Sequence, residues 1–145
     1  MNKREAVVQH VQNLTFIGKA SSNHWTTVDS SHGESSAAAT SPMELILIAL
    51  GACTGSDVAI ILEKKRVCFT KLEMKISGER AAKDPKVYTT IHINYIVEGV
   101  NLKEKDVAHA VELSMTKYCS VSAMLKKSAA LTYSYTIMEA GAAAG

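Results

Sequence analysis

The sequence predicts an α+β fold in which strands pack around one long central helix. Residues 42–65 are apolar and begin with a proline, which is typical of a buried helix. Residues 68–80 and 86–100 alternate between apolar and polar side chains, which is typical of strands. With 145 residues, of which 47% are hydrophobic, the chain is expected to form a single domain over residues 1–140. Residues 141–145 are expected to be a disordered tail.

The N-terminal part of the chain is predicted to form three strands. Residues 5–20 contain β-branched side chains in partial alternation around Asn13, which predicts a hairpin with its turn at that residue. Residues 24–31 predict a third, short strand. Residues 30–41 are small and polar, so we expect them to form a mobile surface loop.

The central helix is predicted to begin sharply. Ser41 is suited to the N-cap and Pro42 to the first helical position, and Glu44 follows the cap by three residues, as in a capping box. Few polar residues interrupt the segment before Glu63. A helix that is apolar on nearly all sides must be buried on nearly all sides, which a chain of 145 residues achieves with difficulty.

Small residues gather in the middle of this helix and would let another helix backbone approach closely. They are Ala49, Gly51, Ala52, Gly55, Ser56 and Ala59. We therefore expect the same helix of a second subunit to pack here, which would make the protein a homodimer. The alternative is a helix covered only by the sheet of its own chain.

The remaining elements follow from local patterns. Asp84 and Pro85 predict a turn between two neighbouring strands. The apolar positions expected in the second strand are Val87, Ile91, Ile93, Tyr95 and Val97. Residues 102–117 predict an amphipathic helix, with Val107, Ala110, Val111 and Ser114 facing inward. A shorter helix over 121–129 and a final strand over 131–140 complete the order, and the strands are expected to be antiparallel.

Charge and composition exclude several classes of partner. The net charge is +2 with the basic residues scattered, which argues against nucleic acid or an anionic membrane surface. The longest apolar run, Leu45 to Cys53, is far shorter than the roughly 20 residues that span a bilayer. The N-terminus does not resemble a signal peptide, so we expect a cytoplasmic protein. In that compartment, a bond between two of the three cysteines would be catalytic or transient.

The three cysteines have different surroundings. Cys53 lies in the most apolar helix, where a thiol is often only a small buried side chain. Cys68 opens a strand without polar neighbours and is expected to be structural. Cys119 lies where one helix gives way to another, and a helix N-terminus there would favour its thiolate. The spacing leaves open whether Cys53 and Cys119 meet. No CxxC or HxxxH pair is present, so no metal site is expected.

Two motifs in this order resemble the OsmC/Ohr family, the osmotically induced and organic hydroperoxide resistance proteins. They are SPMELILIALGACTGSDVAIIL (41–62) and KYCSVSAML (117–125). The expected order of strands and helices is similar over nearly the whole chain. The resemblance implies an OsmC-like fold, with antiparallel sheets around the central helices of an intertwined homodimer. It also implies an active site on each side of the dimer, built from both subunits.

The resemblance further implies a cysteine-based peroxidase in oxidative-stress defence. Cys53 would attack the O–O bond of an organic hydroperoxide or of hydrogen peroxide and become a sulfenic acid. Cys119 would resolve it as a disulfide, and an external dithiol would reduce the enzyme without any cofactor. Two alternatives stay open. One is a redox sensor or small-ligand binding protein without turnover on the same scaffold, and the other is a structural dimer with inert thiols.

The chain departs from the family pattern beside the first cysteine. Members that reduce organic hydroperoxides hold a glutamate ten residues before that cysteine, paired with an N-terminal arginine. Here Met43 occupies the position, and Glu44 lies on roughly the opposite side of the helix from Cys53. No arginine lies at the usual place, and Ser120 replaces the usual proline. The resemblance is therefore to a divergent branch, and the substrate is left open.

A cation is expected to activate Cys53, because a mid-helix thiolate receives no support from the helix dipole. The candidates are Arg4, His24, His32 and Arg80. We expect Arg80 to take this role, since it ends a predicted strand before a turn. A solvated surface arginine is the alternative.

Overall fold

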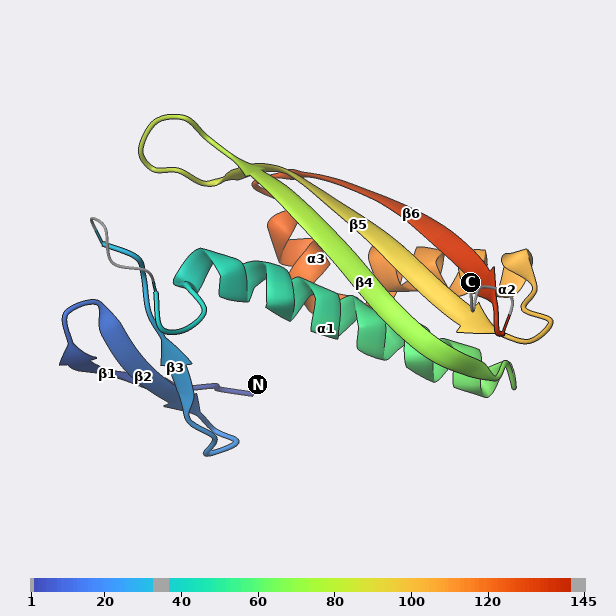
Figure 1. Ribbon diagram of the computed structural model, residues 1–145, viewed down its shortest axis with the longest axis horizontal. Helices are drawn as coiled ribbons and strands as arrows, with labels where there is room; N and C mark the ends of the chain where they lie inside the picture. Colours follow the sequence, from blue (N-terminus) through green and yellow to red (C-terminus); the bar gives the residue numbers. More distant parts are fainter. Residues whose placement is uncertain (1, 33–36, 142–145) are drawn as a thin grey trace. The chain divides into compact units, whose positions relative to one another are not determined.

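The computed structural model describes residues 2–32 and 37–141 (Figure 1). The chain forms two compact units, one up to Ile46 and one from Leu47 onward. Each unit is described by itself, and a single domain over residues 1–140 stays a prediction. The expected mobile loop 30–41 lies partly outside the described residues, as does most of the expected tail 141–145.

The first unit contains an antiparallel sheet of three strands in the order β1-β2-β3. Its strands are β1 (Ala6–Gln12), β2 (Thr15–Ala20) and β3 (Thr26–Val28). Asn13 lies in the turn between β1 and β2 with a φ of 48°, a conformation that asparagine tolerates well. The predicted hairpin, its turn residue and the third strand are confirmed.

Asp29 holds two segments of this unit together. Its carboxylate accepts hydrogen bonds from the backbone N–H of Ser30 at 2.9 Å and of Ala38 at 2.7 Å. The bond from Ala38 is the main reason that the pKa of Asp29 is lowered. The backbone N–H of Asp29 also donates to the carbonyl of Thr40, at 3.1 Å. Residues just after β3 are thereby fixed to residues that lead into the long helix.

Helix α1 (Pro42–Lys64) has the predicted capping box. The backbone N–H of Glu44 donates to Ser41 Oγ at 3.2 Å, and the backbone N–H of Ser41 donates to Glu44 Oε1 at 3.0 Å. The helix ends at Lys64. Two residues later Arg66 adopts a φ of 58°, and the N–H of Val67 donates back to the carbonyl of Leu62. This is a left-handed C-terminal cap. Local chemistry therefore sets both ends of α1.

The second unit contains a mixed sheet in the order β4-β5-β6. Its strands are β4 (Phe69–Arg80), β5 (Tyr88–Gly99) and β6 (Ala130–Glu139). β4 and β5 are antiparallel as expected, but β5 and β6 are parallel, in register from Thr90↔Ala130 to Gly99↔Glu139. The prediction of antiparallel strands is wrong for β6. Three helices connect β5 to β6 and return the chain to the start of β5, and such a crossover gives parallel pairing.

Helical segments cover one side of this sheet (Figure 1). They are α1, α2 (Glu104–Leu113), the π-helical turn η1 (Ser114–Tyr118) and α3 (Ser120–Leu125). The core residues contributed by β5, α1 and α2 are Tyr88, Ile91, Ile93, Tyr95, Val97, Leu50, Val58, Leu62, Val107, Ala110 and Val111. The inward side predicted for residues 102–117 is confirmed, because Ser114 is buried as well.

Val87 is the exception among the predicted core positions. It precedes β5 and is 45% exposed, whereas Tyr88 is 8% exposed. The pairing register shifts between Glu79 and Arg80 opposite this point. An irregularity of this kind reverses the alternation of side chains along a strand, which is why Tyr88 and not Val87 enters the core.

Two of the small residues of α1 face the sheet of the same chain. A Cβ atom at Gly51 would lie 2.7 Å from Ile76 Cδ1, and one at Gly55 would collide with the end of Met74. Their small size is thus explained by β4. Ile48 and Ala52, next to this contact, are exposed, Ile48 by 55%, and line an open groove with Met74 and Ile76. The sheet of its own chain therefore covers only part of α1.

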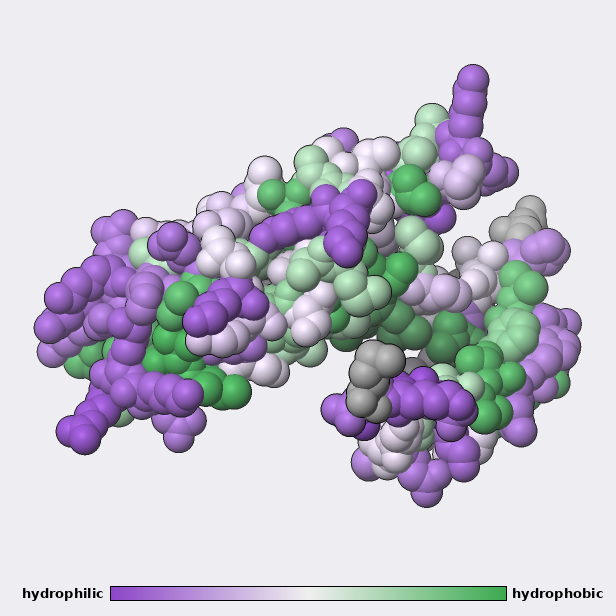
Figure 2. Space-filling model, turned by 180° about the vertical axis from the view of Figure 1, so that it is seen from behind, coloured by the Kyte–Doolittle hydropathy of each residue, from purple (hydrophilic) through white to green (hydrophobic). Residues whose placement is uncertain are grey.

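Much of the surface of α1 stays apolar and exposed within one chain. In the described part of the chain, α1 is long and apolar enough to cross a membrane, with a mean hydropathy of 2.2. This is weak evidence for a membrane, because core helices of soluble proteins meet the same criterion. Hydrophobic side chains reach the surface of the second unit in Figure 2. The single chain therefore leaves part of the apolar surface of α1 open.

Replacing Ser41 by alanine is expected to lower the free energy of unfolding by about 1 kcal/mol, because the N-terminus of α1 loses its cap. Ser41→Thr should retain most of the stability. Urea denaturation followed by circular dichroism measures both. Ser21→Ala, at an exposed turn residue, is the matched control. Equal stability of Ser41→Ala and wild type would show that the cap does not stabilise the helix.

Candidate functional site

The structure brings two of the three thiols together. Cys53 lies in the middle of α1 and is half-buried, and Cys119 lies between η1 and α3 with 3% exposure. Their side chains are within hydrogen-bonding reach of each other. The contact joins two elements that are far apart in the sequence, and the spacing of the cysteines could not predict it.

Local backbone geometry positions Cys119. Its N–H donates to the carbonyl of Ser114 at 2.8 Å, which closes the π-helical turn η1. Cys119 itself is extended, with φ −73° and ψ 105°, and α3 begins at the next residue. The N–H of Ser122 donates to Cys119 Sγ at 3.4 Å, so the thiol caps α3. The predicted change of helix around residues 118–122 is confirmed.

Burial raises the pKa of the Cys119 thiol, and the neighbouring Cys53 raises it further. The hydrogen bond from Ser122 acts in the opposite direction but is outweighed. The helix N-terminus lies where we expected it and, through the Ser122 N–H, acts in the expected direction on the pKa of Cys119, but burial has the larger effect. Desolvation of the charged form is the larger effect, so Cys119 is held as a neutral thiol.

The other expected site residues are not drawn into this contact. Cys68 is exposed just before β4, so its thiol is not part of the core. Arg80 is the exposed last residue of β4, and its Nε donates to the carbonyl of Lys86 at 2.7 Å. The role of Arg80 as the activating cation stays a prediction. The other candidate cations, Arg4, His24 and His32, belong to the first unit.

A chain of buried hydroxyl groups lies next to Cys53. Thr54 Oγ1 is 2.6 Å from Tyr95 Oη on β5 and 2.7 Å from Ser114 Oγ on η1. Ser114 Oγ in turn donates to Asp57 Oδ2 at 2.9 Å. All three hydroxyl-bearing side chains are fully buried. The chain therefore links β5, α1 and η1 beside the two thiols.

The hydrogen bonds of this chain run in one direction. Each hydroxyl carries one hydrogen, and Ser114 uses its hydrogen on Asp57. Ser114 must then accept from Thr54, and Thr54 must accept from Tyr95. Burial raises the pKa of Tyr95 to about 12, so its hydroxyl stays a neutral donor. Sequence reasoning missed this chain, although Thr54 and Asp57 stand out as polar residues in an apolar helix.

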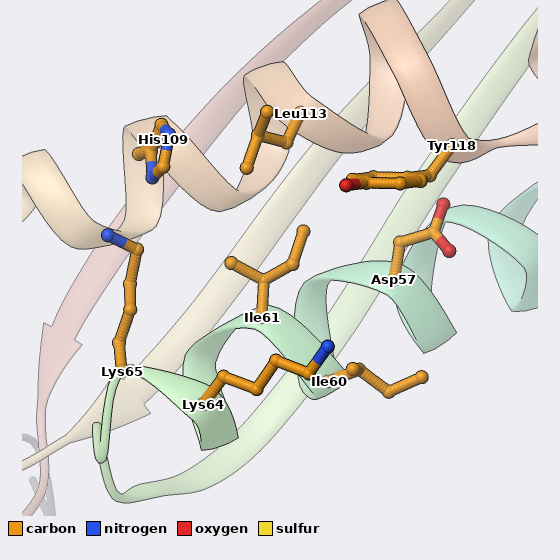
Figure 3. A pocket seen from close by; sticks show the side chains of 8 residues that line it. All are labelled: Asp57, Ile60, Ile61, Lys64, Lys65, His109, Leu113 and Tyr118. Atoms are coloured by element: carbon orange, nitrogen blue, oxygen red, sulfur yellow. The ribbon is translucent and has the colours of Figure 1, made fainter.

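A pocket of 480 Å³ lies between α1 and the segment formed by α2 and η1 (Figure 3). It is lined by Asp57, Ile60, Ile61, Lys64, Lys65, His109, Leu113 and Tyr118. Asp57 follows Cys53 by about one helical turn, and Tyr118 immediately precedes Cys119. In Figure 3 the Tyr118 ring lies over Asp57. The end of the pocket formed by these two residues is thus the end nearest the thiols. No sequence pattern pointed to this pocket.

Among residues 2–32 and 37–141, no cluster of three His, Cys, Asp or Glu side chains could hold a metal ion. Within the second unit, the chemistry of the site is therefore carried by two thiols, a chain of hydroxyls ending on a carboxylate, and a pocket with basic residues. Such a set can exchange electrons through sulfur and bind a small molecule beside it.

Comparison with known proteins places this site in a family context. The family model described as OsmC-like protein matches residues 32–134. Protein YhfA of Escherichia coli (strain K12) is 41% identical over 136 residues, which cover 94% of this chain and 99% of that protein.

Solved structures share the fold. A hypothetical protein from Aquifex aeolicus VF5 is 36% identical with a TM-score of 0.84, covering 96% of this chain and 98% of that chain. An organic hydroperoxide resistance protein OsmC from Legionella pneumophila has a TM-score of 0.69 at 12% identity, covering 94% of this chain and 98% of that chain. The two three-stranded sheets and the long helix are thus those of OsmC/Ohr proteins.

The raised pKa and burial of Cys119 predict slow alkylation. In the reduced protein at pH 7.5, iodoacetamide should modify exposed Cys68 faster than Cys119, because burial both raises the pKa of the Cys119 thiol and shields it from the reagent. Peptide mass spectrometry over time measures both rates in one sample. Unfolding in urea should make the rates similar. Equal rates in the folded protein would contradict the described burial of Cys119.

Proposed function

Because the chain belongs to the OsmC-like family, we propose that it is a thiol-dependent peroxidase of the oxidative-stress response. It would reduce organic hydroperoxides or hydrogen peroxide in the cytoplasm through Cys53 and Cys119. The fold shared with an organic hydroperoxide resistance protein supports a peroxide-related function. The single observation that carries the proposal is the contact between the Cys53 and Cys119 side chains.

The first step takes place at Cys53. Its half-buried position leaves the sulfur within reach of a small substrate. The thiolate attacks one peroxide oxygen, so that an S–O bond forms and the O–O bond breaks. Sulfur loses two electrons and becomes a sulfenic acid, and the departing alkoxide takes a proton and leaves as an alcohol, or as water from hydrogen peroxide.

Cys119 completes the oxidation. Its sulfur attacks the sulfenic sulfur of Cys53, an S–S bond forms, and the hydroxyl group leaves with the Cys119 proton as water. The raised pKa of Cys119 suits this order, because a neutral thiol does not compete for the peroxide. An external dithiol then exchanges with the disulfide and restores both thiols. No cofactor enters these steps.

Arg80 is proposed as the cation that stabilises the Cys53 thiolate, from its own chain or from a second subunit. The guanidinium is exposed, and one of its N–H groups donates to Lys86. The remaining N–H groups of an arginine can bind another anion at the same time. Unchanged alkylation of Cys53 in Arg80→Gln would remove Arg80 from the mechanism.

Peroxide is expected to convert the reduced protein into a Cys53–Cys119 disulfide, because the two thiols are already in contact. One equivalent of cumene hydroperoxide followed by non-reducing peptide mass spectrometry detects it. In Cys119→Ser, Cys53 should instead accumulate as a sulfenic acid that dimedone traps. Cys68→Ser is the matched control and should form the disulfide normally. If neither product formed at Cys53, the proposed function would be wrong.

A redox sensor or small-ligand binding protein on the same scaffold is the second candidate. Met43 at the usual glutamate position favours it, because part of the machinery for rapid turnover is replaced. The two functions differ in rate. A dithiol-coupled assay with kcat/KM of about 10⁴ M⁻¹s⁻¹ or more would support the peroxidase and remove the sensor.

We also propose that the protein is a homodimer packed through α1. Ile48 is 55% exposed and Ala52 is exposed, and both line an open apolar groove beside Met74 and Ile76 of β4. Burial of apolar side chains at this surface would drive association. The Cys53 side of the helix is turned by more than 90° from these residues.

Ile48→Glu is expected to convert the dimer into monomers of 15.6 kDa, because a charge would be buried at the interface. Sedimentation velocity at micromolar concentration measures the mass. Val100→Glu, at a loop residue that is 62% exposed, is the matched control and should remain dimeric. A wild-type chain that sediments as a monomer would contradict the dimer.

A further inference from the structure

The pocket beside the thiols carries opposite charges at its two ends. Asp57 lies at the end near Cys53, whereas Lys65 and His109 lie at the other end, from which the Lys64 side chain extends toward Ile60. Asp57 and Lys64 are seven residues apart, which is about 10 Å along a helix. In Figure 3, Lys65 extends toward His109, and Lys64 lies along the pocket beside Ile60. The charge of the side chains that line the pocket therefore changes from negative to positive along its length.

The pocket runs along α1 from Asp57, about one helical turn after Cys53, to Lys64 and Lys65. Cys53, Asp57, Ile60 and Lys64 follow one another by four, three and four residues, which places them on one face of the helix. The facing wall comes from α2 and η1, in the order His109, Leu113 and Tyr118, and ends beside Cys119. One end of a bound molecule would thus lie at Asp57 and Tyr118, the lining residues nearest to the two thiols in the sequence, and its other end would lie at the C-terminus of α1.

The middle of the pocket is apolar. Ile60, Ile61 and Leu113 form its walls, together with the ring of Tyr118. Ile60 is 51% exposed, so a ligand there would cover hydrophobic surface that the single chain leaves open. Burial of apolar surface is favourable in proportion to its area. At 480 Å³ the pocket is within the range of small-molecule sites.

The basic end is only partly neutralised by the protein. Lys65 Nζ pairs with Asp106 at 3.8 Å, whereas Lys64 makes no ion pair with any residue that the structure describes. The partial negative charge at the C-terminus of α1 favours cations. This explains why a lysine lies in the last turn of the helix, but it does not explain why that lysine lines a pocket. An anionic group would pair with these ammonium groups, and Asp57 would repel it from the thiol end.

We propose that this pocket binds a molecule with an apolar body and a single anionic end group, a carboxylate or a phosphate. The anionic end lies at Lys64 and Lys65, and the uncharged end lies at Cys53 and Cys119. The reaction of a bound peroxide with Cys53 rests on the proposed function, whereas binding rests only on the pocket. Lys64 and Lys65 are thus the residues that determine which substrates are preferred.

Three eight-carbon probes that differ only in their end group test the proposal: octanoate, octyl phosphate and octan-1-ol. Isothermal titration calorimetry on the full-length reduced protein is expected to give about fivefold tighter binding for the better anion than for the alcohol, the equivalent of about 1 kcal/mol. Stronger binding of octyl phosphate than of octanoate would identify phosphate as the end group, and the reverse order would identify carboxylate.

Lys64→Gln combined with Lys65→Gln should remove the preference for the anion while the alcohol still binds. Lys71→Gln, at an exposed lysine of β4 that pairs with Glu73, is the matched control and should retain the preference for the anion. Octanoate should also slow labelling of Cys53 by N-ethylmaleimide in the wild type, which places the probe beside the thiols.

Equal affinity for octanoate, octyl phosphate and octan-1-ol in the wild type would overturn the proposal. So would a preference for the anion that persists without Lys64 and Lys65. These outcomes are independent of peroxide chemistry. If the protein binds the anion but forms no disulfide, the proposed binding site stands and the proposed peroxidase function fails. If it forms the disulfide but does not prefer the anion, the peroxidase function stands and the binding site fails.

Discussion

The hydrogen bonds of the Thr54 hydroxyl hold the site together. This fully buried group contacts Tyr95 of β5 and Ser114 of η1, and so joins the sheet and two helical segments at one point. Thr54 is adjacent to Cys53, and the carbonyl of Ser114 accepts the N–H of Cys119. The residues that fix the fold here are therefore the ones that place the two thiols in contact.

The same burial makes the two thiols chemically different. Buried polar groups are costly unless all are hydrogen-bonded, and among the described residues none of the buried side-chain nitrogen or oxygen atoms lacks a partner. Cys119 lies within this dry region, where desolvation raises its pKa, whereas Cys53 is partly open to solvent. A substrate would meet Cys53 first, and Asp57 ends the hydroxyl chain where the pocket begins.

Sequence reasoning succeeded where neighbouring residues decide the structure. The capping box of Ser41 and Glu44, the hairpin at Asn13 and the inward side of α2 follow from spacings of a few residues, and all are present. It failed at Val87, because the extra residue Thr89 in β5 shifts the pairing with β4 and reverses the alternation of side chains at the start of β5. It also failed for β6, whose direction depends on the path of the three helical segments before it.

The sequence by itself determined the order of elements, the ends of α1 and the break in the helix at Cys119, because these depend on backbone hydrogen bonds and side-chain periodicity within a few residues. Only the tertiary structure decided that Cys53 meets Cys119, that Tyr95, Thr54 and Ser114 form one chain, and that basic residues line the far end of a pocket. Those contacts join distant segments, and they arise from the packing of α1 against the sheet and against η1.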